Sequence, residues 1–394
     1  MTRSPEKTAF YALELIPGKA FRAATAWLDG HPTFIPLSEF LMNSSKDEVV
    51  EEDVILFGRR MNSQQEFPLV WYKNGEVRFG IDLPQWIRII QQELYRPEHA
   101  KPITARLPFQ YHKIPGVIRN FLAIVLLRVK TMSENSVYPI SPFNPGCEIL
   151  VTACGMLRKL HNDPIVVLTH DIDTKYGFIW IRRIGQIEEN HGFRSSWNVV
   201  PKSYPIDKAM LHDIKARGHE IGLHGIWHNN KEAFLSRETL YQEFLKLQPL
   251  ISEFGIRGYR GPSWYRTRVM FDVLAKFFEY DSSCLDNDFI CPGGSGGVGM
   301  IRPFRIREEL VELPCTLPFE APLFFGHSSN SMLEYWLPKI KWIKCVGGVL
   351  VVNTHPDPNY LGNEKMLKVY HSMLAHLNQE GWQGMLPHEI ARRY

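Results

Sequence analysis

The second half of the chain alternates short apolar segments with helical stretches, and this alternation restricts its fold more than any other feature. From about residue 147 the apolar segments lie at 165–170, 195–200, 220–224, 256–260, 279–283, 311–316 and 348–354, and helical patterns such as 237–253 and 266–277 separate them. Strands that alternate with helices form β/α layers or barrels. We therefore expect an α/β fold of the layered or barrel type here.

Several of these strands end in polar residues: Asp171 and Asp173, His224, Arg260, Asp281 and His355. In a (β/α) barrel the active site is built at the C-terminal ends of the strands. One face of such a barrel would therefore gather all of these side chains.

The first of these strand ends carries two carboxylates. Because side chains alternate between the faces of a strand, Asp171 and Asp173 are expected to point the same way. Two carboxylates this close on a buried strand repel one another unless a cation or a shared proton offsets the repulsion. The alternative is a strand end that caps the next helix, which is common for one Asp and less so for two.

His224 and His228 are spaced four residues apart. On a helix this spacing places two imidazoles on one face, where they can hold one metal ion. A solvated helix surface or a packed core pair is the alternative, and the upstream Asp171 and Asp173 favour the metal site.

Charge and termini exclude several other classes of protein. Lys and Arg number 45 against 42 Asp and Glu in 394 residues, so nothing in the charge indicates a nucleic-acid partner. The N-terminus shows no secretory signal, and the six cysteines form no C-x-x-C pair, which is typical of a reducing compartment. We expect a cytoplasmic protein. The apolar run 121–127 is far shorter than the roughly 20 residues that span a bilayer.

We divide the chain into an N-terminal α+β domain (1–133), a linker with a lead-in helix (134–160) and a catalytic barrel (161–394). The first domain contains a hairpin pattern around Asn74-Gly75. Residues 118–130 form an apolar stretch with basic ends, expected to be a buried interdomain helix or, alternatively, a peripheral membrane contact. The glycine tract 293–299 formally matches G-x-G-x-x-G but no strand precedes it, so we interpret it as a loop over the site.

Five short motifs occur in the order found in one enzyme family. They are Thr169-His-Asp-Ile-Asp173, His224-x-x-x-His228, Tyr259-Arg-Gly-Pro-Ser-Trp264, Tyr280-Asp-Ser-Ser283 and Leu350-Val-Val-Asn-Thr-His355. With this set the chain resembles the polysaccharide deacetylases (NodB homology, carbohydrate esterase family 4) over about residues 160 to 360. The resemblance implies a distorted, seven-stranded (β/α) barrel that hydrolyses an N-acyl group on an amino sugar.

The resemblance also implies a role for each motif residue. It makes Asp173, His224 and His228 the ligands of a divalent metal, which we expect to be zinc, with iron, cobalt, nickel or manganese as alternatives. Asp171 is then the base that takes a proton from water, and His355 is the general acid. Arg260 would orient the base and keep it ionised, and Asp281 would hold the acid histidine in its useful tautomer.

Two departures from the family pattern leave alternatives open. The usual first motif has adjacent aspartates, whereas Ile172 separates them here, so the roles of Asp171 and Asp173 could be exchanged. The fourth motif usually carries a second Asp followed by Trp. This chain instead has Cys284-Leu-Asp286-Asn, and Asp286 is an alternative to Asp281.

We expect a metal-dependent N-deacetylase that acts on an amino sugar during glycan assembly, for example on a nucleotide-linked or lipid-linked intermediate. A deformylase or another C–N hydrolase is the alternative within the same chemistry. An inactive carbohydrate-binding protein on the same fold is the alternative from a different class.

Overall fold

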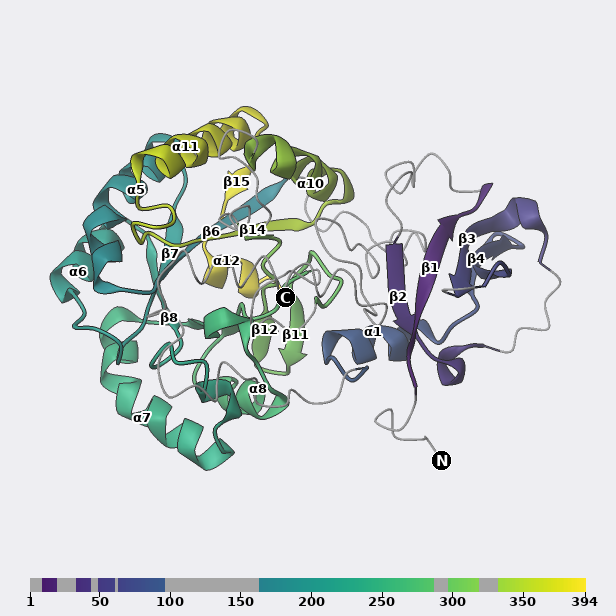
Figure 1. Ribbon diagram of the computed structural model, residues 1–394, viewed down its shortest axis with the longest axis horizontal. Coiled ribbons are helices and arrows are strands. Elements are labelled where there is room, and N and C mark those ends of the chain that lie inside the picture. The colour runs from purple at the N-terminus through teal and green to yellow at the C-terminus, as the bar shows by residue number, and fades with distance from the viewer. Residues whose placement is uncertain are drawn as a thin grey trace.

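The protein contains two separate β-sheets. The computed structural model describes residues 9–19, 33–43, 49–60, 63–95, 163–286, 297–318 and 332–394. Within these ranges a small antiparallel sheet comes from the N-terminal residues and a larger, mostly parallel sheet from residue 165 onward. Figure 1 shows the small sheet beside the ring of strands and helices that the larger one forms.

The N-terminal unit is an antiparallel sheet with a helix packed on it. The strands, in the spatial order β2-β1-β3-β4-β5, are β1 (Tyr11–Pro17), β2 (Thr33–Leu37), β3 (Val54–Arg60), β4 (Glu66–Lys73) and β5 (Glu76–Phe79). Helix α1 (Leu83–Gln91) buries Trp86 against this sheet. Asn74 and Gly75 both have positive φ (55° and 83°), as a two-residue hairpin turn requires, so the hairpin expected there is confirmed.

The larger unit alternates strands with outer helices. Its strands are β6 (Ile165–Ile172), β7 (Ser195–Val199), β8 (Glu220–His224), β9 (Gly258–Arg260), β10 (Tyr280–Asp281), β11 (Phe304–Arg307), β12 (Leu310–Glu312), β13 (Leu317–Pro318), β14 (Val349–Thr354) and β15 (Gln383–Gly384). Its α-helices are α5 (Phe178–Asn190), α6 (Lys208–Ala216), α7 (Arg237–Phe254), α8 (Arg268–Leu274), α10 (Met332–Val346), α11 (Glu364–Gln379) and α12 (Pro387–Ala391). The 3-10 turns are Glu39–Leu41, Glu51–Asp53, Lys175–Gly177, Glu232–Phe234 and Pro262–Trp264.

The stretch 310–318 closes the parallel sheet into a barrel. Parallel pairing runs from β10 through β9, β8, β7 and β6 to β14. At its start the stretch pairs with β10 as β12, and at its end it pairs with β14 as β13. Between β12 and β13, the backbone N–H of Cys315 donates to the carbonyl of Cys284 (2.8 Å). The backbone N–H of Thr316 donates to the carbonyl of Val351 (3.1 Å). The result is the expected distorted (β/α)7 barrel.

Alternation along β6 separates the barrel interior from the helical layer. Ile165 and Val167 pack inside the barrel against residues of α12, whereas Val166 and Leu168 belong to the core under the outer helices. Figure 1 shows α12 within the ring of strands. All eight residues of β6 are buried, as expected for a strand covered on both sides. Continuing this alternation points Asp171 inward and His170 outward.

Six of the seven expected strands are present as single elements. The seventh, 311–316, is divided into β12 and β13 because it leaves one neighbour and joins another. The expected helices 237–253 and 266–277 correspond to α7 and a shorter α8. The expected linker and lead-in helix (134–160), the apolar stretch 118–130 and residues 293–296 of the glycine tract lie outside the described residues.

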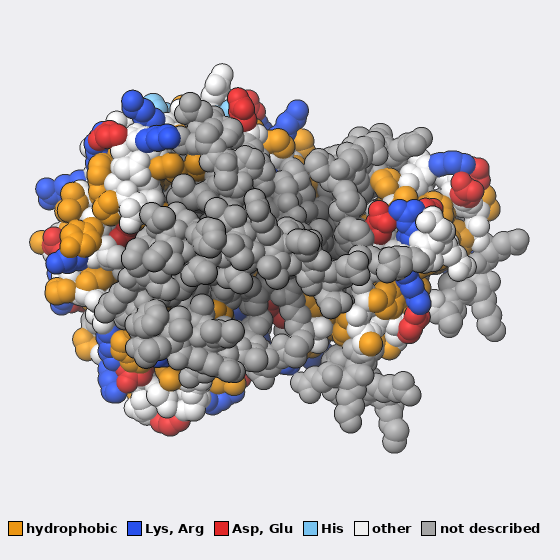
Figure 2. All heavy atoms as spheres, in the orientation of Figure 1, with side chains coloured by type: hydrophobic (Ala, Val, Ile, Leu, Met, Phe, Trp, Pro, Cys, Tyr) orange, Lys and Arg blue, Asp and Glu red, His pale blue; other side chains and the backbone are white. Residues whose placement is uncertain are grey.

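The surface agrees with the nearly balanced composition. In the view of Figure 2, basic and acidic side chains are interspersed over the described surface of the barrel. Among the described residues, no helix combines the length and apolar character needed to cross a bilayer.

Replacement of Gly258 by Ala is expected to destabilise the barrel. A Cβ at this position would lie 1.8 Å from the ring of Tyr280, whose hydroxyl is held by Glu220 (3.0 Å). Overpacking of this kind costs about 1–3 kcal/mol. Urea denaturation of Gly258→Ala should show a lower midpoint with an unchanged slope, whereas Ser372→Ala on the exposed side of α11 should behave like the parent protein. An unchanged midpoint for Gly258→Ala would contradict this packing.

Candidate metal centre and catalytic site

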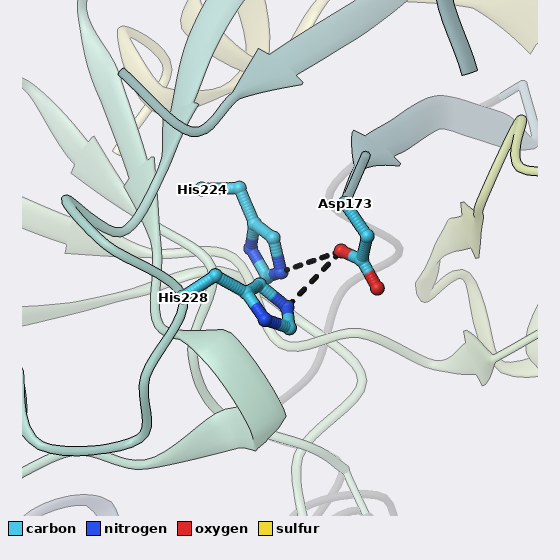
Figure 3. Close-up of side chains that lie close together, drawn as sticks. All are labelled: Asp173, His224 and His228. Atoms are coloured by element: carbon cyan, nitrogen blue, oxygen red, sulfur yellow. Dashed lines mark ion pairs between the residues drawn. The ribbon is translucent and has the colours of Figure 1, made fainter. Parts of the chain in front are cut away.

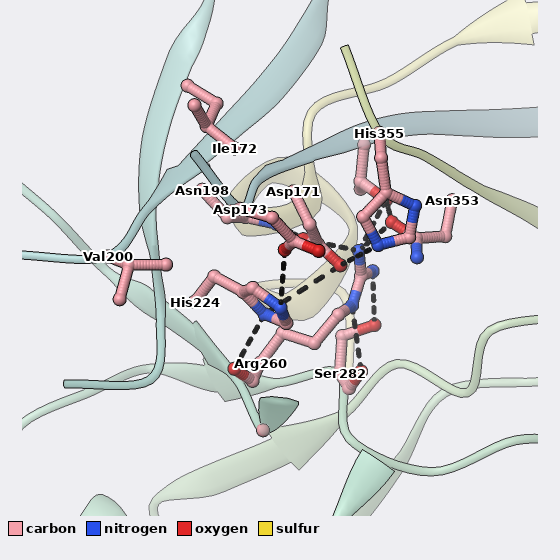
Figure 4. Close-up of polar contacts among 12 residues, drawn as sticks. Asp171, Ile172, Asp173, Asn198, Val200, His224, Arg260, Ser282, Asn353 and His355 are labelled. Atoms are coloured by element: carbon pink, nitrogen blue, oxygen red, sulfur yellow. Dashed lines mark hydrogen bonds and ion pairs between the residues drawn. The ribbon is translucent and has the colours of Figure 1, made fainter. Parts of the chain in front are cut away.

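Five of the six polar residues expected from the strand ends, all but Asp281, gather at one end of the barrel. Asp171 lies near the end of β6 and Asp173 directly follows it, while His224 ends β8, Arg260 ends β9 and His355 directly follows β14. Because parallel strands all present their carboxyl ends on the same side, these side chains converge although they are up to 184 residues apart. Figure 4 shows them turned toward a common centre.

Asp173, His224 and His228 form a candidate metal site. The Oδ1 atom of Asp173 lies 3.4 Å from Nε2 of His224 and 3.1 Å from Nε2 of His228 (Figure 3). One ligand atom from each residue lies within 4.8 Å of the others. Ligands about 2.0–2.1 Å from a tetrahedral zinc ion are separated from each other by roughly 3.3–3.4 Å. The two measured separations are close to this value, so the residues fit a divalent cation.

The protein orients the first imidazole for this purpose. The Nδ1 atom of His224 lies 3.2 Å from the carbonyl oxygen of Arg260, which can only accept a hydrogen bond. Nδ1 therefore carries the proton, and the lone pair of Nε2 faces Asp173. A backbone carbonyl is a common outer partner of a histidine that binds metal.

The expectation that His224 and His228 share a helix face is wrong. His224 is the last residue of β8, and His228 stands in the loop that follows. Gly225 and His228 both adopt positive φ (69° and 53°), which folds the loop back so that the second imidazole comes beside the first. A Cβ on Gly225 would lie 2.1 Å from Oε1 of the buried Glu232, whose Oε2 accepts the N–H of Ile226 (2.6 Å). This tight loop, and not helical periodicity, explains the spacing of four.

Asp171 is buried beside the metal site and is held in its ionised form. Its Oδ1 accepts from Nδ2 of Asn198 (2.8 Å) and from Nη1 of Arg260 (3.2 Å), and its Oδ2 lies 4.0 Å from Nε2 of His355. Burial by itself raises the pKa of the Asp171 carboxyl. The charge of the Arg260 guanidinium and the hydrogen bond from Asn198 act against burial, and this pKa lies below its usual value.

Arg260 is tied to three other strand ends. Its Nε donates to the carbonyl of Ser282 (3.0 Å) and its Nη2 to the Ser282 hydroxyl (2.9 Å). Its Nη1 also donates to Thr169 (2.8 Å) and to Asn353 (2.6 Å). The indole of Trp264 lies over the guanidinium, 5.4 Å from it. The Arg260 guanidinium is therefore held in one position beside the Asp171 carboxylate.

The chain is similar in sequence to a curated deacetylase. It is 24% identical over 247 residues to the peptidoglycan deacetylase of Helicobacter pylori, a match that covers 55% of this chain and 83% of the relative. No protein-family model matches the chain. The match agrees with the resemblance of the ordered motifs to the polysaccharide deacetylase family.

Crystal structures with a similar chain trace include members of this family. One is a Mycobacterium smegmatis protein assigned as a polysaccharide deacetylase, with 20% identity, coverage of 58% of this chain and 89% of that one, and a TM-score of 0.47. Another is the Puue allantoinase, with 14% identity, coverage of 58% and 89%, and a TM-score of 0.47.

The resemblance implies that Asp281 of the fourth motif holds His355, but in this structure Asp281 has other partners. Both carboxylate oxygens of Asp281 accept from Ser283, through its N–H (3.0 Å) and its hydroxyl (2.8 Å), and the carboxyl is also hydrogen-bonded to Glu312. Burial raises the pKa of Asp281, which suits a proton shared between the two acids. The alternative, Asp286, pairs instead with Lys339 (2.6 Å). Among the described residues, the recorded hydrogen bonds and ion pairs of these two acids are therefore with groups other than His355.

The geometry distinguishes the two acids of the first motif. Oδ1 of Asp173 faces Nε2 of both imidazoles, whereas Asp171 is bound by Arg260 and Asn198. This arrangement favours Asp173 as the ligand and Asp171 as the base over the exchanged assignment.

Some residues of the site were missed from the sequence. Asp357 accepts the N–H of Asp173 (3.2 Å) and the hydroxyl of Thr174, and burial together with the charge of Asp173 raises its pKa to about 7. Asn353 stands two residues before His355, so strand alternation could have found it. Asn198 gave no comparable signal, because it lies inside β7 and not after it.

Metal binding should depend on His228 and not on Asp171. The variant His228→Ala removes a ligand, so we expect its affinity for Zn²⁺ to fall by more than the roughly 10–100-fold that loss of an outer partner costs. Asp171→Asn should bind the metal nearly as well as the parent protein, as should His212→Ala, which removes an exposed imidazole from α6. Titration calorimetry on metal-free protein measures all three. Undiminished affinity in His228→Ala would exclude this centre.

Proposed function

We propose that the protein is a metal-dependent deacetylase that removes an N-acetyl group from an amino sugar of a glycan. The observation that carries the proposal is the convergence of three metal-ligating side chains with an ionised, arginine-held carboxylate and a histidine. Asp173, His224 and His228 supply the first part, and Asp171 and His355 the second. The relative from Helicobacter pylori, named as a peptidoglycan deacetylase, supports the reaction class.

Asp171 accepts a proton from the water that attacks the amide carbon. Its lowered pKa keeps it ionised at neutral pH, and its Oδ2 is turned toward the centre while Oδ1 is held by Arg260 and Asn198. Because Oδ1 is occupied, Oδ2 is the oxygen that receives the proton.

His355 donates a proton to the leaving nitrogen. Its Nε2 lies 4.0 Å from Oδ2 of Asp171, so the proposed acid and base are close enough to act on one amide bound beside them. The water oxygen forms a bond to the acyl carbon, the carbon–nitrogen bond breaks, and the protonated nitrogen leaves as the free amine of the sugar beside acetate. A divalent cation bound by the three ligands would polarise the acyl oxygen and make water more acidic.

For the substrate we propose an amino sugar in a nucleotide-linked or lipid-linked glycan precursor, handled in the cytoplasm. The support is that the described cysteines, Cys284, Cys315 and Cys345, are free thiols, as in a reducing compartment. A polymeric glycan such as the substrate named for the Helicobacter pylori relative is the competing choice.

Acetate release should require a metal. We expect purified protein to release acetate from at least one N-acetylated donor, tested as a nucleotide sugar, a lipid-linked sugar and a peptidoglycan fragment. Chelation should reduce the rate to background, and Zn²⁺, Fe²⁺, Co²⁺, Ni²⁺ or Mn²⁺ added singly should restore it and identify the preferred ion.

Other results would select other functions. Release that continues after complete chelation would contradict the metal mechanism. Release of formate in place of acetate from N-formylated donors would favour a deformylase. Saturable sugar binding by metal-loaded protein without release of any acid would favour an inactive carbohydrate-binding protein.

Loss of the Arg260 charge should shift the acid limb of the pH profile upward. The pKa of Asp171 is lowered partly by this guanidinium, so Arg260→Met should raise it, and a higher pH is then needed to keep the base ionised. Arg260→Lys retains a positive charge and should shift the limb less. Profiles of kcat/KM from about pH 3 to 9, which begin at the low end of the range where carboxyl groups titrate, measure both shifts. An acid limb that stays in place in a folded Arg260→Met variant would show that Asp171 is not the titrating base.

A further inference from the structure

A buried ion pair connects the N-terminal unit to the barrel. The guanidinium of Arg266 donates from Nε to Oε2 of Glu93 (2.9 Å) and from Nη2 to Oε1 (2.5 Å). Arg266 is completely buried and the Glu93 side chain is 11% exposed. A two-point pair of this kind fixes both the distance and the orientation of the guanidinium. Glu93 follows α1 and is held at a positive φ of 53°.

The same arginine also holds the loop that follows Arg260. Its Nη1 donates to the carbonyl of Trp264 (3.0 Å) and to that of Ser283 (3.1 Å). Ser263 and Trp264 have φ of 54° and 61°, a conformation that residues other than glycine keep only when their surroundings enforce it. The hydroxyl of Ser283 accepts the N–H of Gly261 (2.7 Å), so both sides of this turn are held around Arg266.

The turn 261–265 packs against Arg260, the residue that holds the proposed base Asp171. The Trp264 indole covers the Arg260 guanidinium at 5.4 Å, and Arg260 contacts Asp171 at 3.2 Å. A continuous series of contacts therefore runs from Glu93 through Arg266, Trp264 and Arg260 to the base. Every side chain in the series is buried or nearly so.

We propose that the N-terminal unit acts as a buttress of the active site, with Glu93 as a positioning residue. Through Arg266, Glu93 keeps Ser263 and Trp264 of the turn 261–265 in their left-handed conformation and Trp264 packed on Arg260. This inference assigns a role to the N-terminal unit and, where it concerns turnover, rests on the proposed deacetylase function. A second contact of the same unit, from the Tyr95 hydroxyl to the carbonyl of Gly297 (3.1 Å), anchors the segment that carries Glu93.

The test compares Glu93→Gln with Glu14→Gln. Both changes remove one carboxylate from an ion pair with arginine, but Glu14 pairs with Arg59 (2.8 Å) within the N-terminal sheet. Amide hydrogen exchange of the peptide that spans 261–266 reports on the turn without any assay of activity. Two of its N–H groups, of Trp264 and Tyr265, donate within the turn to Gly261 and Pro262.

We expect faster exchange in 261–266 for Glu93→Gln alone, at unchanged metal content. We expect its kcat to fall about 10-fold with KM within about twofold of the parent value, because a misplaced catalytic group costs turnover more than binding. Arg266→Lys keeps the charge but loses the fork geometry, so it should show the same pattern if Glu93→Gln fails to fold. Glu93→Asp should recover part of the loss.

Two results would overturn the proposal. One is exchange in 261–266 equal to that of the parent protein in a folded variant, and the other is parental kcat despite a loosened turn. If the parent protein itself releases no acetate, the deacetylase proposal fails, while the exchange comparison still decides whether Glu93 holds the turn.

Discussion

The buried guanidinium of Arg260 is the interaction on which the site depends. A charge without access to water is stable only when it is paired and its donors are satisfied. Arg260 meets this condition with acceptors from three different strand ends: Thr169 and Asp171 at the end of β6, Ser282 after β10 and Asn353 in β14. Strands β6 and β14 also position Asp173, a candidate metal ligand, and His355, the proposed acid. The register of the barrel and the geometry of the site are therefore fixed by one hydrogen-bonded cluster, and a strand that shifted would leave a buried charge unpaired.

The barrel could be predicted because its strands are covered on both sides and so appear as apolar runs that end in polar residues. The alternation of side chains along β6 also predicted which of its residues point into the barrel. Asp171 points into the barrel, while its neighbour His170 points under the helices, where Nε2 lies 2.7 Å from Glu188 and the ring stacks on Trp197 at 4.1 Å. His170 is thus a buried structural residue. Local periodicity was sufficient here because the outcome depends only on which face a residue occupies.

Contacts made by distant residues could not be predicted in this way. The spacing of His224 and His228 is compatible with a helix or with a strand end and a tight loop, and only the buried carboxylate of Glu232 under Gly225 selects the loop. Asp281 matches a family motif in sequence, yet its neighbour Glu312 comes from a strand 31 residues later, and nothing in the sequence indicated this partner. A motif gives the residue type at a strand end, but its partner is set by the three-dimensional fold.

The charges around the candidate centre favour a cation independently of the donor set. Three carboxyls, Asp171, Asp173 and Asp357, lie at this edge, and the fixed positive charge of Arg260 contacts the first of them. The imidazoles must be neutral at their ligating nitrogens to bind a metal, so they cannot balance the remaining charge at the same time. The pKa of Asp357, raised to about 7 by burial and by Asp173, reflects this excess of negative charge. A divalent cation at the three ligands would lower that pKa, because a bound ion is the largest charge in its surroundings. Asp357 would then stay ionised, and its hydrogen bond with the N–H of Asp173 would strengthen as the ligand is engaged.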